Sequence, residues 1–398
     1  MRAIRTDEAL LNDVAGTPLT SEQAMLRETA RAVVESKVLT HMADAERDEQ
    51  FPPQVVAPLR EAGLLGGTIP VEWGGAGLDH VSHALVVEEV SSRWQVLGSL
   101  VAMASGPVGR GLLTHGTDAQ RERWLRPLAE GTALAGYALT EPDSGSDASA
   151  MRTRAERTDA GYVLTGAKTW IDWANDGDFF LTFARTEPGS VGAKGISAFI
   201  VPHDAPGLTT TIMRGKLGMR ALSVGELVMD ECEVAAENLV GEPGRGFAVA
   251  MSALEEARLM VAARISGGIA GVLRAVAAYI EERELFGRKL GDFQMTQAKV
   301  ADMVVALECA RTLTFRAAML KDRGLPASRA VLTAKLFAQE AYMDVSRDAV
   351  QLFGAYGMSE EYEVNRHFRD AKVSEVTGGT SEILRILLSE QVRGRSRR

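Results

Sequence analysis

Two neighbouring segments of the chain gather residues that could hold a flat, polar cofactor. Residues 137–147 contain several hydroxyls, small residues and one proline. Backbone N–H groups and hydroxyls in such a turn can bind a polar ring edge or a phosphate without steric obstruction. Residues 168–171 add the indole of Trp170, an apolar plate on which a ring system can stack. Because a Ser/Gly/Asp turn alone is usually only a turn, the pairing of the two segments carries the information.

Bulk properties limit the classes of protein to which the chain can belong. Its 398 residues are enough for two or three domains, and 46% apolar content is ordinary for a globular protein. A net charge of −9 argues against an extended nucleic-acid surface, although a phosphorylated ligand would still need a local basic patch. Cys232 and Cys309 lack metal-like spacing, and we interpret them as inert thiols in a reducing cytoplasm.

The chain ends give no targeting signal. Residues 1–8 lack the apolar run of a signal peptide, and no segment has the uninterrupted apolar length of a membrane span. We therefore expect a cytoplasmic protein without a membrane partner. The basic residues 393–398 are expected to form a frayed, solvated end.

The chain divides into three zones that differ in predicted secondary structure, and these zones must position the two segments. Residues 1–133 are helical, with a helix capped by Thr20 or Ser21, another over residues 80–93 and a helix start at Thr117. Residues 134–245 hold short apolar runs that predict strands over 162–166, 179–184, 196–201 and 225–229. Residues 246–398 return to long apolar helices over 247–283, 294–323 and 327–354.

The predicted fold class is therefore α+β, with an N-terminal α-helical domain, a middle antiparallel β domain or small barrel, and a C-terminal helical bundle. The strands lack the long crossover helices of a doubly wound sheet, and no GxGxxG lies between a strand and a helix. Part of the apolar surface of the bundle is expected at a subunit interface.

Four ordered motifs give the chain a resemblance to the acyl-CoA dehydrogenase family over nearly its full length. Residues 138–147 match one signature, and residues 351–358, followed by Glu361, Arg366 and Asp370, match a second. Ala355 departs from that second signature, where a Gly or Ser is usual. Residues 283–288 with 293–294, and residues 379–383, resemble two further family elements.

The resemblance implies FAD and a set of contacts to it. The residues that would face the flavin are Tyr137, Leu139, Thr140, Ser146, Trp170 and Ile171. Those that would hold the diphosphate and adenosine end, partly across a subunit boundary, are Arg283, Phe286, Gln294, Gln351 and Gly354. Thr380 and Glu382 would also contact FAD, and Ser146, Glu255 and Arg258 would contact the substrate. Without the motif, Arg283 would be read as an ordinary surface charge.

The family reaction needs a base that removes a proton alpha to a thioester carbonyl, while the flavin takes a hydride from the beta carbon. Relatives place a Glu at one of two positions, which in this chain are Gly378 and Ala257. Glu256 is one residue away, but one step on a helix rotates a side chain by about 100°. Glu256 is a candidate base, and the alternative is that Glu255 and Glu256 form a solvated helix face.

A second departure follows Trp170 and Ile171. Relatives usually carry Thr and then Asn there, whereas this chain has Asp172 and Trp173. A carboxylate beside the reactive flavin nitrogen would oppose negative charge on reduced flavin unless its pKa rises. Asp172 is therefore a candidate acid or base, and the alternative is a turn residue that caps local N–H groups.

The six histidines are scattered, and we expect surface or capping roles for them rather than metal ligation. His80 and His83 are spaced for one helix face, but no carboxylate partner is evident in the sequence. The sequence indicates no metal site.

The leading hypothesis is an FAD-dependent oxidoreductase that introduces an α,β double bond into an acyl thioester carried by CoA or by an acyl-carrier protein. Electrons would pass to an electron-transfer flavoprotein or another acceptor, and the chain would form a homotetramer or homodimer. The alternatives are a flavoenzyme of the same fold with oxidase, monooxygenase, reductase or elimination chemistry, and a catalytically silent binding partner.

Overall fold

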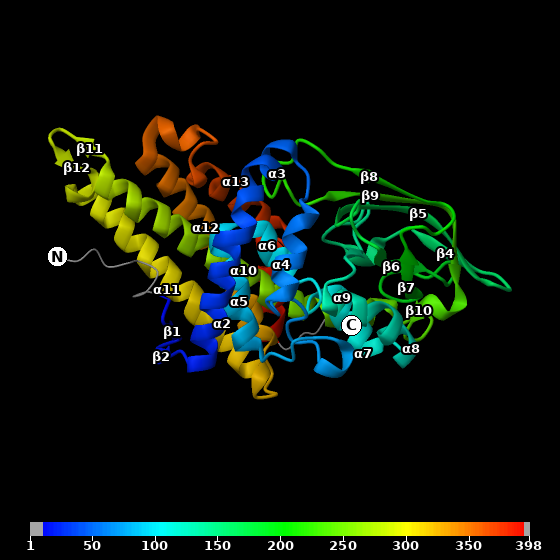
Figure 1. Cartoon of the computed structure of the whole chain (residues 1–398). Helices are drawn as coiled ribbons and strands as arrows, with labels where there is room; N and C mark the ends of the chain where they lie inside the picture. The colour runs from blue at the N-terminus through cyan, green and yellow to red at the C-terminus, as the bar shows by residue number, and fades with distance from the viewer. Residues whose placement is uncertain (1–10, 394–398) are drawn as a thin grey trace.

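The computed structural model describes residues 11–393, and the two chain ends discussed above lie largely outside them. Helices come first, a sheet follows and helices return, so the predicted α+β fold is confirmed (Figure 1). In Figure 1 the sheet forms one end of the molecule and the long helices form the other.

The N-terminal part is a set of short helices that begins after a small hairpin, β1 (Asp13–Val14) and β2 (Thr17–Pro18). Its helices are α2 (Ser21–Val33), α3 (Met42–Asp48), α4 (Val56–Glu61), α5 (His80–Arg93), α6 (Gln95–Val101), α7 (Pro107–His115), α8 (Asp118–Gln120) and α9 (Arg126–Glu130). Thr20 and Thr117 each cap a helix and form a capping box with the Gln three residues later. Both starts therefore follow from local sequence chemistry.

The middle part is one eight-stranded, mainly antiparallel sheet, as predicted. Its strands are β3 (Ala135–Ala138), β4 (Arg154–Arg157), β5 (Gly161–Asp172), β6 (Phe179–Arg185), β7 (Ile196–Pro202), β8 (Leu208–Ile212), β9 (Val224–Ala235) and β10 (Leu239–Val240). The order is β10-β7-β6-β4-β5-β9-β8, and β3 pairs with β6 in parallel. The pairing of β5 with β9 is irregular between Lys168 and Ile171, which is where the candidate flavin segment lies.

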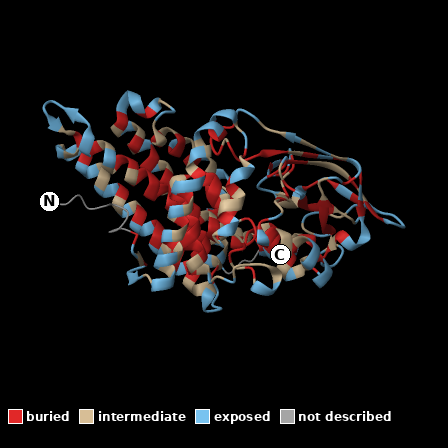
Figure 2. Cartoon of the chain, viewed as in Figure 1, coloured by how far each residue is buried: buried red, intermediate tan, exposed pale blue. Residues whose placement is uncertain are grey.

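The C-terminal part is the predicted helical bundle. It contains α10 (Gly246–Glu282), α11 (Gln294–Asp322), α12 (Ser328–Phe353), α13 (Glu363–Val376) and α14 (Ser381–Val392), with the hairpin β11 (Glu284–Leu285) and β12 (Arg288–Lys289) after α10. Helix α10 packs against α5, α11 and α12 and is the centre of the fold. Figure 2 shows buried residues concentrated along these central helices and in the sheet, whereas the β11–β12 hairpin is exposed.

Helix α10 corrects one expectation. By length and composition it could cross a membrane, because an 18-residue window has a mean hydropathy of 1.5. However, 89% of that window is buried inside the fold. Its apolar character is accounted for by its central place in the bundle.

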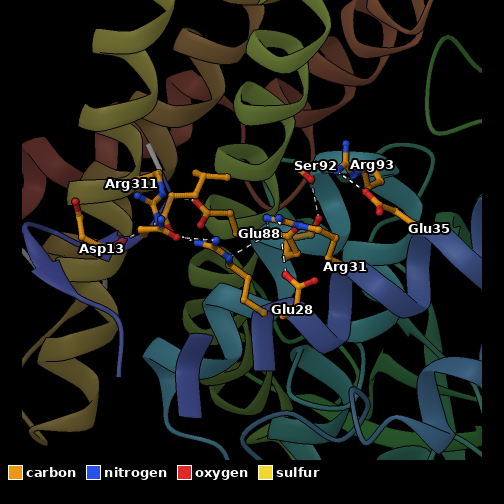
Figure 3. A network of polar contacts seen from close by, with 12 residues as sticks. Asp13, Glu28, Arg31, Glu35, Glu88, Ser92, Arg93 and Arg311 are labelled. Carbon is orange, nitrogen blue, oxygen red and sulfur yellow. Dashed lines mark hydrogen bonds and ion pairs between the residues drawn. The ribbon is translucent and has the colours of Figure 1, made fainter. Parts of the chain in front are cut away.

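A buried network of charges joins the first helices to the bundle (Figure 3). Arg311 on α11 pairs with Glu88 on α5 at 2.9 Å, and both side chains are almost fully buried. Arg31 on α2 pairs with Glu89 at 2.9 Å, so α5 presents adjacent carboxylates to two different helices. A buried charge pair is costly to break, because the partner that remains has lost its solvation as well as its counter-charge.

Candidate functional site

A buried ion pair fixes the two candidate flavin segments to each other. Lys168 Nζ lies 2.8 Å from Glu141 Oε1, and both side chains are nearly inaccessible to solvent. Burial lowers the pKa of Lys168 to about 8 despite its carboxylate partner. Burial alone would raise the pKa of Glu141, but Lys168 and the backbone N–H groups of Arg152 and Thr153 together lower it. The sequence did not predict this pair, although it holds residues 137–147 against β5.

Trp170 has the exposure and the backbone conformation of a ligand-contacting residue. Its side chain is 63% exposed, and its φ of 58° places a non-glycine residue in the left-handed region. A large apolar side chain held in that region is strained, and such strain is concentrated at functional sites. An exposed indole beside a sheet bulge is the open stacking surface that the sequence predicted.

The side chains of the other predicted flavin contacts point in different directions. Tyr137 is half-buried, and its hydroxyl donates to the carbonyl of Ala250 on α10 at 3.1 Å. Thr140 is half-buried and Ser146 is exposed. The side chains of Leu139 and Ile171 are buried in apolar clusters, so only their backbone can face a ligand on the Trp170 side.

Asp172 shares the outer face of β5 with Trp170. Both side chains are exposed, whereas that of Ile171 between them is buried. Many protein atoms still surround Asp172, and this desolvation raises its pKa, while Arg264 and Lys216 oppose the rise. A carboxyl group that is exposed to solvent, yet has its pKa raised by the protein atoms around it, can act as an acid or a base.

Helix α10 brings the predicted substrate residues to the loop before α14. Arg258 Nε donates to the carbonyl of Gly378 at 3.1 Å. Gly378 has a φ of 68°, which favours glycine, and Thr380 caps α14 by accepting from the N–H of Ile383. Glu382 in the first turn of α14 is exposed. Tyr137 lies within electrostatic range of Arg258, so these segments and β3 surround one region.

Glu256 lies in a different environment, and its reading as part of a solvated helix face is wrong. Its side chain is only 2% exposed, and its carboxylate lies 3.0 Å from Lys321 Nζ and 3.3 Å from His80 Nε2. Burial would raise the pKa of Glu256, but His80 and Lys321 lower it to about 2. A carboxylate held so firmly in its charged form is a weak proton acceptor at neutral pH.

The expectation for the histidines is also wrong at several positions. His80 lies between Glu256 and Asp322, whose Oδ1 is 2.6 Å from His80 Nδ1. His83 and His367 are buried, and burial lowers the pKa of His83 to about 4. The partners of His80 come from α10 and α11, far away in the sequence, so no local pattern could have indicated them.

The residues predicted for the adenosine end lie far from Trp170. Arg283, Phe286, Gln294, Gln351 and Gly354 are all exposed. The ring of Tyr279 stacks on Phe353 at 3.8 Å, and Arg283 lies over Tyr356 at 5.8 Å, so the ends of α10 and α12 meet here. This end carries the β11–β12 hairpin, opposite the sheet in Figure 1. One chain therefore does not bring the two predicted halves of a flavin site together.

Comparison with models of known protein families identifies the family of all three parts of the chain. The models of the acyl-CoA dehydrogenase N-terminal, middle and C-terminal domains match residues 20–132, 136–232 and 244–393. The chain belongs to the acyl-CoA dehydrogenase family. This confirms the resemblance from the four motifs, together with the reaction class that the sequence predicted.

Individual relatives agree with the assignment. The chain is 38% identical over 374 residues to the short-chain specific acyl-CoA dehydrogenase of Clostridium acetobutylicum, covering 94% of this chain and 98% of that protein. The butyryl-CoA dehydrogenase structure from Megasphaera elsdenii has a TM-score of 0.90 and 34% identity, and 94% and 99% of the two chains are covered. The prolyl acyl carrier protein oxidase AnaB also has a TM-score of 0.90, at 29% identity, with 94% and 99% covered.

Proposed function

We propose that this chain is an FAD-dependent dehydrogenase that introduces an α,β double bond into an acyl thioester. The observation that carries the proposal is the exposed, conformationally strained indole of Trp170 on β5, within a fold of the acyl-CoA dehydrogenase family. When bound, FAD supplies the hydride acceptor. Trp170 would stack on the ring system, and Arg258 and the loop at Gly378 would border the thioester.

Asp172 is the group proposed to handle a proton at the flavin face. Its raised pKa lets it hold a proton more readily than an ordinary aspartate. In this neutral form it would not repel the negative charge of a reduced flavin beside it. Glu256 is a less favourable candidate, because His80 and Lys321 already hold its carboxylate.

The proposed assembly is a homodimer or homotetramer, because the predicted flavin-facing residues lie on or just after β3 and on β5 of the sheet, whereas those for the adenosine end lie at the end of the bundle that carries the β11–β12 hairpin (Figure 1). Phe286 supports this proposal, since it is 94% exposed at the tip of the β11–β12 hairpin, also at a positive φ of 51°. A large apolar side chain so exposed is a candidate interface residue. The carrier of the acyl group is proposed to be CoA or a carrier protein, and the acceptor an electron-transfer flavoprotein, both in the cytoplasm.

The proposal is tested by mixing the purified flavoprotein anaerobically with a panel of acyl-CoA thioesters and following the visible absorbance of the flavin. Bleaching by at least one thioester is expected, and Trp170→Ala should weaken FAD retention about tenfold from the loss of ring stacking. Val191→Ala, which also truncates an exposed apolar side chain, is the matched control. Protein that binds no FAD, or reduced flavin that forms only with a nicotinamide donor, would refute the proposal.

A further inference from the structure

Two basic side chains border the loop at Gly378 and Gly379. Lys335 Nζ on α12 donates to the carbonyls of Gly379 at 2.5 Å and Ser374 at 3.5 Å. Arg258 Nε donates to the carbonyl of Gly378 at 3.1 Å. Among residues 11–393, neither cation forms an ion pair with an acidic side chain. The hydrogen-bond acceptors of these two basic side chains are therefore backbone carbonyl oxygens.

The surrounding acidic groups are engaged elsewhere. Glu255, the acid that acts electrostatically on Arg258, lies 3.7 Å from Lys321 Nζ. Glu375 pairs with Lys372 at 2.6 Å on the surface of α13. Arg264 is also within electrostatic range of Lys335, but Asp172 and Asp370 offset its charge. The balance of charge at Arg258 and Lys335 themselves is therefore positive.

Burial makes this balance unfavourable without an anion. Lys335 is fully buried, and Arg258 is half-buried. Burial, together with Arg258 and Arg264, lowers the pKa of Lys335 to about 7, so an anion beside it would favour its charged form. A buried cation that lacks a counter-charge is costly, so an anion that enters the region is stabilised.

The two glycines leave room for that anion. A Cβ atom added at Gly378 would meet only Lys335 Cε and Val261 Cγ2, both at 3.7 Å, which is ordinary contact. A Cβ atom at Gly379 would lie 3.8 Å from Arg258 Nε and Nη2. A small group next to these glycines would therefore lie beside the half-buried guanidinium of Arg258, with Lys335 and Leu384 also in contact range.

We propose that the acyl group carries its own carboxylate on the alpha carbon, as in a 2-carboxyacyl (malonyl-type) thioester, and that Arg258 beside Gly378 binds this carboxylate. The inference rests on the proposed function and specifies its substrate class. It also explains why neither Gly378 nor Ala257 needs to be a base.

The reaction balances without removal of an alpha proton. The bond between the alpha carbon and the carboxylate breaks, CO₂ leaves, and the electron pair stays on the alpha carbon in conjugation with the thioester carbonyl. Bound FAD would accept the hydride from the beta carbon, and the product would be a neutral α,β-unsaturated thioester. The negative charge would pass from the carboxylate to the thioester enolate, near the same two basic groups, before it leaves with the hydride.

The test compares ethylmalonyl-CoA with butyryl-CoA, which has the same chain length without the carboxylate. In the anaerobic holoenzyme, ethylmalonyl-CoA should reduce the flavin and release one CO₂ for each flavin reduced. Butyryl-CoA should react about 10²-fold or more slowly, because that is the usual contribution of general-base catalysis. Calorimetry should show that Arg258→Gln weakens ethylmalonyl-CoA binding about tenfold more than it weakens butyryl-CoA binding, because only the first thioester loses a charge-assisted contact.

Gly378→Glu provides the complementary variant, and Gly378→Gln is its matched control with the same size and backbone strain. The Glu variant should lose ethylmalonyl-CoA binding and gain butyryl-CoA oxidation, whereas the Gln variant should gain no oxidation. The inference would be overturned if the unaltered protein binds the two thioesters equally. It would also be overturned if butyryl-CoA, which releases no CO₂, reduces the flavin as fast as ethylmalonyl-CoA does. The second result would leave the proposed dehydrogenase intact. If neither thioester reduces the flavin, the result would instead count against the proposed function. Calorimetry would then still show whether the protein binds ethylmalonyl-CoA more tightly than butyryl-CoA, which decides whether the site binds a carboxylate.

Discussion

Replacing His80 by Gln removes the cation that lies between Glu256 and Asp322, where α5, α10 and α11 meet. His80 Nδ1 is 2.6 Å from Asp322 and Nε2 is 3.3 Å from Glu256. Glutamine keeps hydrogen-bonding atoms at this position but cannot carry a proton charge. The substitution therefore isolates the electrostatic part of the cluster.

The magnitude follows from the pKa of His80. Burial would lower this pKa, but the two carboxylates raise it overall from 6.5 to about 9. Since a pKa difference of one is worth about 1.4 kcal/mol, His80 contributes at most about 3 kcal/mol. A folded-state pKa above the unfolded value means that this stability is complete below pH 6.5 and is lost as the pH rises through 9. Glu256 shows the opposite sign, because its pKa of about 2 gives stability that is lost only in strong acid.

The assay is urea unfolding of the wild type and His80→Gln at pH 6 and above pH 9, with His41→Gln as the matched histidine control. The difference in free energy of unfolding between wild type and His80→Gln should be about 2–3 kcal/mol at pH 6 and should fall below about 1 kcal/mol above pH 9. His41→Gln should show no comparable pH dependence. A difference for His80→Gln that stays constant between the two pH values would refute the assignment of a charged His80.

Three further outcomes follow from other sites. Glu88→Ala should lower the free energy of unfolding by about 3–5 kcal/mol, because it leaves Arg311 charged in the core, whereas Asp48→Ala at an exposed pair should leave the urea midpoint nearly unchanged. Phe286→Ala should reduce oligomer content in analytical ultracentrifugation and weaken FAD retention without changing the far-UV circular dichroism; unchanged assembly and FAD content would contradict its interface role. Asp172→Asn should abolish a pH-dependent step in the rate of flavin reduction, and an unaltered pH profile would remove Asp172 as the proton-handling group.

Local chemistry made much of the secondary structure predictable. The helix over residues 80–93 and the cap at Thr117 were expected where they occur, because capping side chains and apolar periodicity act over a few residues. The strands were found for the same reason, since short apolar runs are bounded by Gly, Asp and Pro.

Contacts between distant segments could not be predicted in this way. Glu141 and Lys168 are 27 residues apart, and His80 and Asp322 are 242 apart, yet each pair forms a buried or half-buried contact. Only the fold brings these side chains together, so the sequence left Glu256 open between a candidate base and a solvated helix face, and it showed no carboxylate partner for His80. The motifs gave the FAD contacts by resemblance, together with the expectation that part of the site lies across a subunit boundary.

The most direct measurement is an experimental structure of the purified protein with FAD and a non-reducible thioester bound. Our account predicts the isoalloxazine ring against Trp170 of one protomer and the adenosine end of the same FAD near the Arg283 and Phe286 hairpin of another. The thioester should lie between that ring and Arg258. A flavin bound entirely by one chain, or one that leaves Trp170 in solvent, would contradict the account.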